Sequence, residues 1–251
     1  MAKDNKQGVL FEGFNSVDKT EALMAEYTYL KGDESVNEKR KKTIYNWHLS
    51  KGMSFTDVNE FPIVKAYNGV IPNSLVGFSE ISHQQYDCGL HFFQHDYTFS
   101  RIWPRLDYYT VIVSKFKCVI APDYSLFVDT SKQLNFESLY KNRFVTARWQ
   151  NCGINVIPSA SWGNADSFEY CFEGLPTNSV IAIGAVGVSR NADTLALWRY
   201  GVSQVIEKLH PTAFLIYGSQ IEFEKQGVPV YYHKDFINLN FRNNGQSKKI
   251  N

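Results

Sequence analysis

The run Val180-Ile181-Ala182-Ile183-Gly184-Ala185-Val186-Gly187-Val188 decides the fold, together with the residues that follow it up to Tyr217. Its apolar residues do not alternate with polar ones, which is typical of a strand buried on both faces of a parallel sheet. A helical stripe follows, and it contains Leu195, Trp198, Val202, Val205, Ile206 and Leu209.

Asn191 is the predicted cap of this helix, and His210-Pro211 ends it. A second apolar run begins directly afterwards, at Ala213–Tyr217. A strand, a helix and a strand with short connections predict a right-handed crossover between parallel strands.

The same alternation extends outward from this unit. Further short apolar runs, each predicted to be a strand, lie at Ile63–Tyr67, His91–Asp96, Cys118–Ala121, Ile154–Ile157 and Val228–Tyr232. A second helical stripe contains Phe136, Leu139, Tyr140, Phe144 and Ala147. These elements predict an α/β domain over residues 56–240. With parallel strands alternating with helices, a TIM-like barrel, complete or incomplete, is favoured over an open doubly wound sheet.

Residues 1–55 are predicted to form a helical extension, and residues 241–251 a flexible tail. One helix is expected over residues 17–30, and a second from a capping box of Ser35 and Glu38 to about Leu49. The second helix carries the cations Lys39, Arg40, Lys41 and Lys42. Such a run is usually a solvated helix face, and the alternative is a patch that contacts nucleic-acid phosphates.

The charge balance excludes a strongly basic packaging protein for nucleic acid. The chain has 26 Lys and Arg against 25 Asp and Glu, which leaves room for a local basic groove only. No apolar stretch is long enough to span a membrane, and the polar N-terminus does not resemble a signal peptide. The four cysteines, Cys88, Cys118, Cys152 and Cys171, are expected to be reduced thiols, most of them buried. We therefore expect a cytoplasmic protein with no membrane partner.

In either parallel architecture the functional site lies at the carboxyl ends of the strands. Polar, small and aromatic residues follow the predicted strands at His95-Asp96, Pro122–Ser125, Ser159–Asn164, Gly187–Asn191 and Tyr217–Gln220. The substrate-binding residues that we predict from these segments are Ser125, Ser161, Trp162, Asn164, Arg190 and Tyr217.

Asp123 is the first catalytic candidate, because a carboxylate directly after an apolar strand lies at the floor of a pocket, where burial can tune its pKa. The alternative is a turn in which Asp123 binds backbone N–H groups near Ser125. Asp96 is the second candidate, and two carboxylates on neighbouring strand ends could form an acid–base pair.

Trp162 could stack on a planar ligand, and the alternative is that its ring closes the end of the sheet. Arg190 lies at a predicted helix start, where the guanidinium and backbone N–H groups would suit a phosphate. The glycines before Arg190 do not complete a GxGxxG or P-loop pattern.

Cys88, His91 and His95 have donor types that suit zinc. On a strand, however, His91 and His95 would lie ~13 Å apart, too far for one ion to bridge. We therefore predict no metal and no cofactor. The chain also lacks the GxSxG pattern of a serine hydrolase.

Four segments of the chain are similar to an uncharacterised family found on phages and other bacterial mobile elements. They are Val119–Phe127, with its Pro-Asp-aromatic-Ser sequence, Arg148–Gln150, Val156–Gly163 and Ser167–Phe172. The resemblance covers roughly residues 85–235. The family has no agreed activity, so the resemblance implies a setting: handling nucleic acid, or opposing or supplying a host defence.

The leading hypothesis is an enzyme that acts on nucleic-acid bases or nucleotides, most concretely a hydrolase or transferase of the DNA glycosylase type. In this scheme Asp123 stabilises or attacks the sugar carbon, Asp96 handles protons and Trp162 holds a flipped base. One alternative is a non-catalytic DNA-binding accessory of replication or partition that uses Lys39–Lys42. Another is a protein that sequesters a defence-signal nucleotide without turnover.

Overall fold

The computed structural model describes residues 45–83 and 86–234. The predicted helix over residues 17–30, the cations Lys39–Lys42 and the predicted tail 241–251 lie outside these residues. The second predicted helix reaches the described chain only at its end, where Trp47–Ser50 form the 3-10 helix η1.

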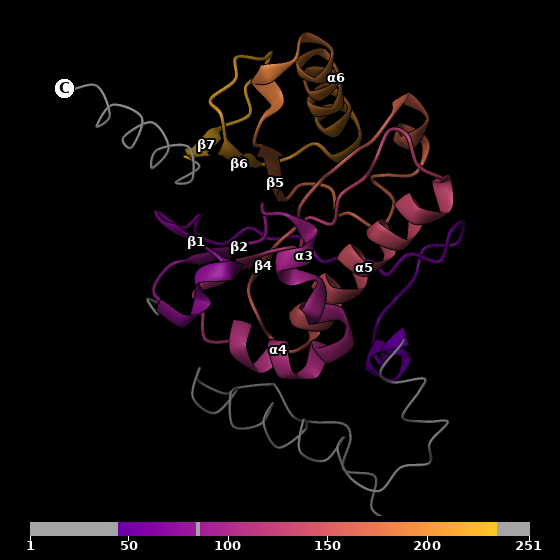
Figure 1. Ribbon diagram of the computed structural model, residues 1–251, viewed down its shortest axis with the longest axis vertical. Coiled ribbons are helices and arrows are strands. Elements are labelled where there is room, and N and C mark those ends of the chain that lie inside the picture. Colours follow the sequence, from indigo (N-terminus) through magenta and orange to yellow (C-terminus); the bar gives the residue numbers. More distant parts are fainter. Residues whose placement is uncertain (1–44, 84–85, 235–251) are drawn as a thin grey trace, which may run out of the picture.

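Within the described residues, seven strands form two sheets (Figure 1). The strands of the first sheet are β1 (Leu75–Gly77), β2 (Gly89–His91), β3 (Cys118–Ile120) and β4 (Val156–Ile157), in that order. Those of the second sheet are β5 (Val180–Ala185), β6 (Ala213–Gly218) and β7 (Val230–His233). Every neighbouring pair in both sheets is parallel. The predicted α/β class with parallel strands is therefore confirmed.

The two sheets are joined just beyond β4. Ser159 pairs with Ala182 of β5 in an isolated parallel bridge. Ala182 N donates to Pro158 O at 2.8 Å, and Ala160 N donates to Ala182 O at 3.0 Å. The strand order therefore continues from the first sheet into the second without a reversal.

Helices cover the outer faces of the two sheets (Figure 1). Besides η1, the helices of the described residues are η2 (Phe78–His83), α3 (Asp96–Phe99), η3 (Ser100–Arg105), α4 (Leu106–Val113), α5 (Lys132–Asn151), η4 (Ala165–Glu169), η5 (Val188–Arg190) and α6 (Ala192–Leu209), and α4, α5 and α6 pack on the sheets. One core lies between the first sheet and helices α4 and α5, and contains Val119, Phe144 and Trp149. A second core lies between the other sheet and α6, and contains Ile183 and Val202.

A third core lies between the inner faces of the two sheets. It includes Ile120 of β3, Ile157 of β4, Ala182 of β5 and Leu215 of β6, all of which are buried. Strands of both sheets are thus covered on both faces, which explains their unbroken apolar runs. The end of this shared core at the carboxyl ends of the strands is where the functional candidates lie.

Helix α6 forms as its sequence predicts. The side chain of Asn191 accepts hydrogen bonds from Asp193 N at 2.7 Å and Thr194 N at 3.2 Å, which caps the first turn. His210 ends the helix in the left-handed conformation, directly before Pro211. All four cysteines are buried, as expected.

Two strand predictions are wrong and one strand was missed. Ile63–Tyr67 forms no strand, and its backbone bonds to loop and strand edges, for example from Val180 N to Tyr67 O at 2.9 Å. The run His91–Asp96 leaves the sheet at His91, because the chain turns there, and Asp96 already begins α3. The missed strand β1 is too short to show a period.

Within the described residues, no pairing joins β7 to β1, so the two sheets do not form a closed barrel. Among the same residues, no helix is both long enough and apolar enough to cross a membrane.

Replacing Gly218, at the end of β6, tests how tightly the ends of β5 and β6 pack. Its φ is +121°, and a Cβ there would lie 2.7 Å from Val186 N. Gly227 has a φ of +83° but open space around it. We expect Gly227→Ala to lower the free energy of unfolding by about 1 kcal/mol through strain alone. Gly218→Ala should cost about 2 kcal/mol more, because strain and a backbone clash add. Urea denaturation measures both, and equal losses would contradict the close approach.

Candidate functional site

Two carboxylates lie together at the carboxyl ends of β2 and β3. Asp96 accepts a hydrogen bond from Ser125 N to Oδ2 at 3.0 Å and one from Ser125 Oγ to Oδ1 at 2.7 Å. Asp123 lies two residues before Ser125, and the charge of Asp96 acts on it. The fold therefore brings together Asp96, Asp123 and Ser125.

The carboxyl group of Asp123 is shielded from water and incompletely hydrogen-bonded. The residue as a whole keeps some exposure, but its Oδ1 is buried and has no hydrogen-bond partner. Burial first, and the negative charge of Asp96 second, raise the pKa of Asp123 to about 7. A carboxyl group with that pKa can both release and take up a proton near neutral pH.

Gly184 of β5 makes room for this carboxyl group. A Cβ at this position would lie 3.4 Å from Asp123 Oδ2 and 3.1 Å from Phe93 Cδ1. The absence of a side chain at Gly184 therefore lets Asp123 and Phe93 approach the strand. Sequence analysis noted this glycine only as part of an incomplete phosphate-binding pattern.

Stacked rings lie beside Gly184. Tyr217 pairs with Gly184 in register, and its ring stacks on that of Phe93 with centroids 5.5 Å apart. The ring of His91 approaches Tyr217 to 4.0 Å, although the two belong to different sheets. Tyr217 is 4% exposed, so its ring lies at the floor of the site, below the surface.

His91 is a neutral, inward-facing residue. Its Nδ1 accepts a hydrogen bond from Phe93 N at 3.3 Å. Burial, and to a smaller extent the charge of His233, lower the pKa of His91 to about 3. His91 therefore carries no charge at neutral pH and contributes a ring to the floor.

Asn142 of α5 holds the start of residues 122–127, which we call the Asp123 loop. Its Nδ2 donates to Pro122 O at 2.6 Å and to Ser159 Oγ at 2.9 Å. Asn142 is buried, as is Ser159. This side chain thereby joins the ends of β3 and β4 next to Asp123.

Asn135 holds the other end of the loop. Its Oδ1 accepts from Phe127 N at 3.0 Å, and its Nδ2 donates to Phe127 O at 2.9 Å. Sequence analysis missed both asparagines. Their spacing of seven residues, two helical turns, places them on one helix face beside the apolar stripe, and that was the signal.

Trp162 packs onto helix α6. A Cβ at Gly201 would lie 2.0 Å from Trp162 Cε2, so the indole occupies the space that a side chain at Gly201 would fill. Its ring also lies 6.2 Å from that of Phe168 and 6.4 Å from that of Phe172, centroid to centroid. The indole therefore packs against the core that lies between the second sheet and α6.

Three further predicted binding residues, Ser161, Asn164 and Arg190, are partly or fully exposed. Ser161 and Asn164 are half-buried, and Asn164 O accepts a hydrogen bond from Ser167 Oγ at 2.7 Å. Arg190 is exposed at the end of η5, and Asn191 next to it caps α6. None of these three forms a hydrogen bond or ion pair with Asp96 or Asp123.

Cys88, His91 and His95 do not converge. Cys88 and His91 are buried, whereas His95 is exposed and stacks on Tyr97, with ring centroids 5.7 Å apart. Over residues 45–83 and 86–234, no group of three or more His, Cys, Asp or Glu side chains is placed to hold a metal ion.

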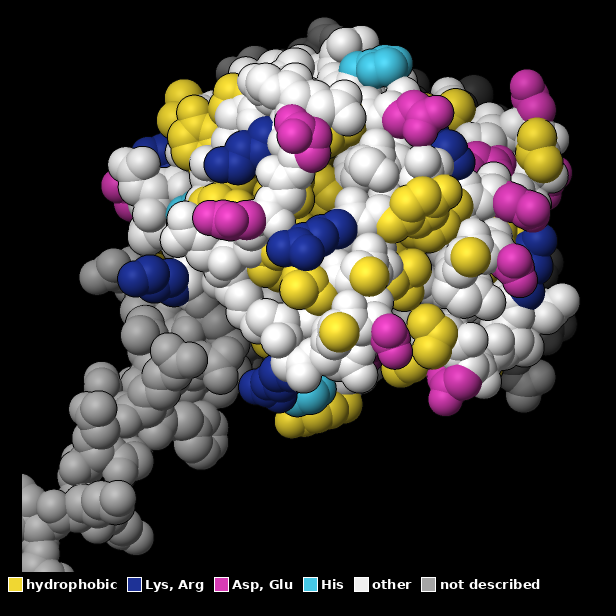
Figure 2. Space-filling view, turned by 90° about the horizontal axis from the view of Figure 1, so that it is seen from above, with side chains coloured by type: hydrophobic (Ala, Val, Ile, Leu, Met, Phe, Trp, Pro, Cys, Tyr) yellow, Lys and Arg dark blue, Asp and Glu magenta, His cyan; other side chains and the backbone are white. Residues whose placement is uncertain are grey.

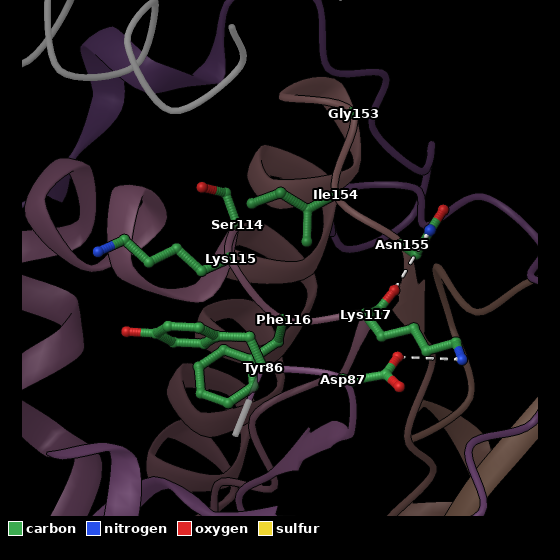
Figure 3. A pocket seen from close by; sticks show the side chains of 9 residues that line it. All are labelled: Tyr86, Asp87, Ser114, Lys115, Phe116, Lys117, Gly153, Ile154 and Asn155. Carbon is green, nitrogen blue, oxygen red and sulfur yellow. Dashed lines mark hydrogen bonds and ion pairs between the residues drawn. The ribbon is translucent and has the colours of Figure 1, made fainter. Parts of the chain in front are cut away.

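A cavity of about 410 Å³ opens at the opposite ends of the strands (Figure 3). Tyr86, Phe116 and Ile154 line it together with Lys115 and Asn155. The lining residues precede β2, β3 and β4, whereas Asp123 follows β3. The cavity therefore does not share a surface with the two carboxylates.

A family model described as "Domain of unknown function (DUF4417)" matches residues 53–235. The chain belongs to the DUF4417 family. The match confirms the uncharacterised family expected from the sequence, and it begins well before residue 85.

Two mycobacteriophage proteins are similar to the chain. One, "Gene 1 protein" of Mycobacterium phage L5, is 31% identical over 163 residues, which cover 63% of this chain and 71% of the relative. The "Gene 1 protein" of Mycobacterium phage D29 is 30% identical over 152 residues, 59% of this chain and 56% of the relative. No solved structure matches the chain.

Most of the segments that first suggested this DUF4417 family are structural. Trp149 is fully buried and donates through Nε1 to Thr110 Oγ1 at 3.1 Å. Cys171 and Phe172 are buried in the core beneath α6. The Pro122–Ser125 segment differs, because it brings two polar side chains to the strand ends.

The raised pKa of Asp123 predicts a loss of stability with rising pH. Because the folded protein binds this proton more tightly than the unfolded chain does, the stabilisation is complete below the unfolded pKa of ~4 and is lost as pH rises through about 7. Asp123→Asn should remove this dependence of stability on pH. Between pH 5 and 8 the free energy of unfolding of the wild type should therefore fall by at least about 1 kcal/mol more than that of the variant. Denaturation at several pH values measures it, and parallel curves would refute a raised pKa.

Gly201→Ala tests the position of Trp162. Alanine favours a helix by ~1 kcal/mol over glycine, yet we expect destabilisation by about 1–3 kcal/mol, because the new methyl overlaps the indole. In a Trp162→Leu background the loss should shrink or reverse. Thermal or urea unfolding of the wild type, the two single variants and the double variant gives the coupling energy between the two positions. If Gly201→Ala stabilised the wild type, the indole would have to lie elsewhere.

Proposed function

We propose that this chain is an enzyme acting on nucleic-acid bases or nucleotides, most concretely by cleaving an N-glycosidic bond. One observation carries the proposal: Asp123, with a shielded, unpartnered carboxyl oxygen, lies beside a second carboxylate at the ends of parallel strands. A buried carboxyl group without a partner lowers stability, so its presence favours a chemical role.

We also propose that the two sheets are parts of one incomplete TIM-like barrel. Three observations support this arrangement. The Ser159–Ala182 bridge continues the parallel strand order from one sheet to the other. The rings of His91 and Tyr217 meet across the shared core. Beyond β6, His233 of β7 hydrogen-bonds to the backbone of Pro72, which precedes β1. Functional sites of such barrels lie at the carboxyl ends of the strands.

The pKa of Asp123 favours a different division of roles from that expected from the sequence. Asp123 would donate its proton to the leaving base, and the electron pair of the breaking C–N bond would pass to that base. Asp96, held by both donors of Ser125, would stabilise the positive charge on the sugar. Water would then add to the sugar carbon and return a proton to Asp123, which balances the reaction.

An exposed pair of rings offers a stacking surface that Trp162 does not. The rings of His95 and Tyr97 are stacked at an interplanar angle of 12°, and Tyr97 is 78% exposed. Both residues flank Asp96 in the sequence. A base could therefore stack on this pair while its sugar lies toward the two carboxylates.

The surface charge favours a small or locally bound substrate. Figure 2 shows Lys and Arg interspersed with Asp and Glu, and no continuous basic patch on the face in view. Phosphates along a duplex are normally held by such patches. The phage origin of the two relatives supports a nucleic-acid setting. A role for Lys39–Lys42 in binding DNA stays a prediction, since these residues lie outside the described chain.

The test is a search for product that depends on Asp123. Purified protein is incubated with single-stranded DNA, duplex DNA, nucleosides and nucleotides, and mass spectrometry follows free bases. Asp123→Asn should lower the rate of base release by at least ~100-fold while leaving substrate binding within about threefold, because the variant lacks the acid alone.

Asp129→Asn is the matched control, because Asp129 is an exposed carboxylate that follows the Asp123 loop. It should keep the wild-type rate. Equal rates for the two variants would end the assignment of Asp123. Bound but unchanged nucleotide in every incubation would make the protein a binder without turnover.

A further inference from the structure

Arg143 is a fully buried cation that forms no ion pair within the described chain, although the charge of Glu173 acts on it. Its Nε donates to Glu173 O at 3.0 Å, and one terminal nitrogen donates to Cys171 O at 2.6 Å. The other terminal nitrogen donates to Asn142 Oδ1 at 2.5 Å. Burial lowers the pKa of Arg143 to about 10, which leaves the guanidinium charged at neutral pH.

A buried guanidinium is an expensive way to stabilise a core. Replacing buried charges with apolar side chains of similar volume is often neutral or stabilising. Two of the three acceptors of Arg143 are backbone carbonyls, and the third is the side chain of Asn142. The bond to Asn142 is therefore the one through which Arg143 can act on the site.

This bond fixes which way the Asn142 amide points. Its oxygen faces the guanidinium, so its nitrogen must face Pro122 O and Ser159 Oγ. A reversed amide would set its nitrogen against the guanidinium and its oxygen against Pro122 O, which loses the bonds to Arg143 and to Pro122. Pro122 directly precedes Asp123 in the sequence, and Ser159 pairs with the strand that carries Gly184.

We propose that Arg143 and Asn142 are positioning residues that hold the Asp123 carboxyl group in its shielded place above Gly184. Asp123 has no hydrogen bond through Oδ1 that would hold it there, so the backbone before it has to be fixed instead. The functional importance of this device rests on the proposed function, in which Asp123 is the acid. The hydrogen bonds of the two side chains go to Pro122, Ser159, Cys171, Glu173 and each other, and none goes to Asp123.

The chain offers a matched comparison. Asn135 and Asn142 are both buried asparagines of α5, and both anchor the Asp123 loop through their side-chain amides. Asn135 holds Phe127, four residues after Asp123, whereas Asn142 holds the residue before it. Leucine has a similar size to asparagine, is uncharged and makes no side-chain hydrogen bonds, so Asn135→Leu and Asn142→Leu each remove one side-chain anchor of the loop.

The experiment measures the carboxyl titration of Asp123 by carbon NMR, with the signal assigned by its absence in Asp123→Asn. If Asn142 positions the group, Asn142→Leu admits water to it and lowers its pKa toward ordinary values by about 1 unit or more. Arg143→Met should shift the pKa in the same direction, although Arg143 does not touch the loop. Asn135→Leu should also lower the unfolding midpoint, because its two bonds to Phe127 are lost, but it should leave the Asp123 titration unchanged.

Ser159→Ala is the milder variant, since it removes a single acceptor of Asn142, and it serves if the leucine variants do not fold. It should give a smaller shift with the same sign. Equal shifts in Asn135→Leu and Asn142→Leu would mean general loosening of the loop and would overturn the proposal. So would an unchanged titration in Arg143→Met or Ser159→Ala. Because titration needs no substrate, these outcomes stand whether or not base release is observed.

Discussion

The Asp123 loop follows β3 and crosses the end of the sheet before α5 begins. Some of its backbone groups can pair neither with another strand nor with open water. Buried polar groups need partners, and side chains supply them here. Asn142 donates to Pro122 O, and Asp96 accepts from Ser125 N. Asn135 forms hydrogen bonds with both the backbone N–H and the backbone carbonyl of Phe127. Three anchors thus fix a short loop, and the arrangement of the site depends on them.

The anchors leave two buried groups of the loop without a hydrogen-bond partner, Oδ1 of Asp123 and the hydroxyl of Tyr124. Asp96 accepts two hydrogen bonds from Ser125, so it holds the loop in addition to its proposed chemical role. Its negative charge adds to the effect of burial in raising the pKa of Asp123. The ring of Tyr124 packs on Phe99, and burial together with the charge of Asp96 raises the pKa of its hydroxyl. The fold thus tolerates a local loss of stability around the residue with the most perturbed carboxyl group in the described chain.

The two sheets matter to the site because they share an inner core. Gly184 and Tyr217 come from β5 and β6, whereas His91, Phe93 and Asp123 come from the other sheet or follow it. Their contacts, such as the 4.0 Å approach of His91 to Tyr217, exist only because the inner faces meet. The neutral state of His91 has the same origin, since that core excludes water from the ring.

The sequence by itself determined the parallel α/β class, helices α5 and α6, the Asn191 cap and the place of Asp123 after β3, because periodicity and caps act over a few neighbouring residues. It could not reveal β1, whose three residues carry no period, or the turn after His91. Only the tertiary structure decided three contacts. Asp96 accepts hydrogen bonds from Ser125, the indole of Trp162 packs on Gly201, and Arg143 orients the Asn142 amide. The first two contacts join residues 29 and 39 positions apart, the third joins neighbouring side chains through their rotamers, and packing of the whole chain selects them.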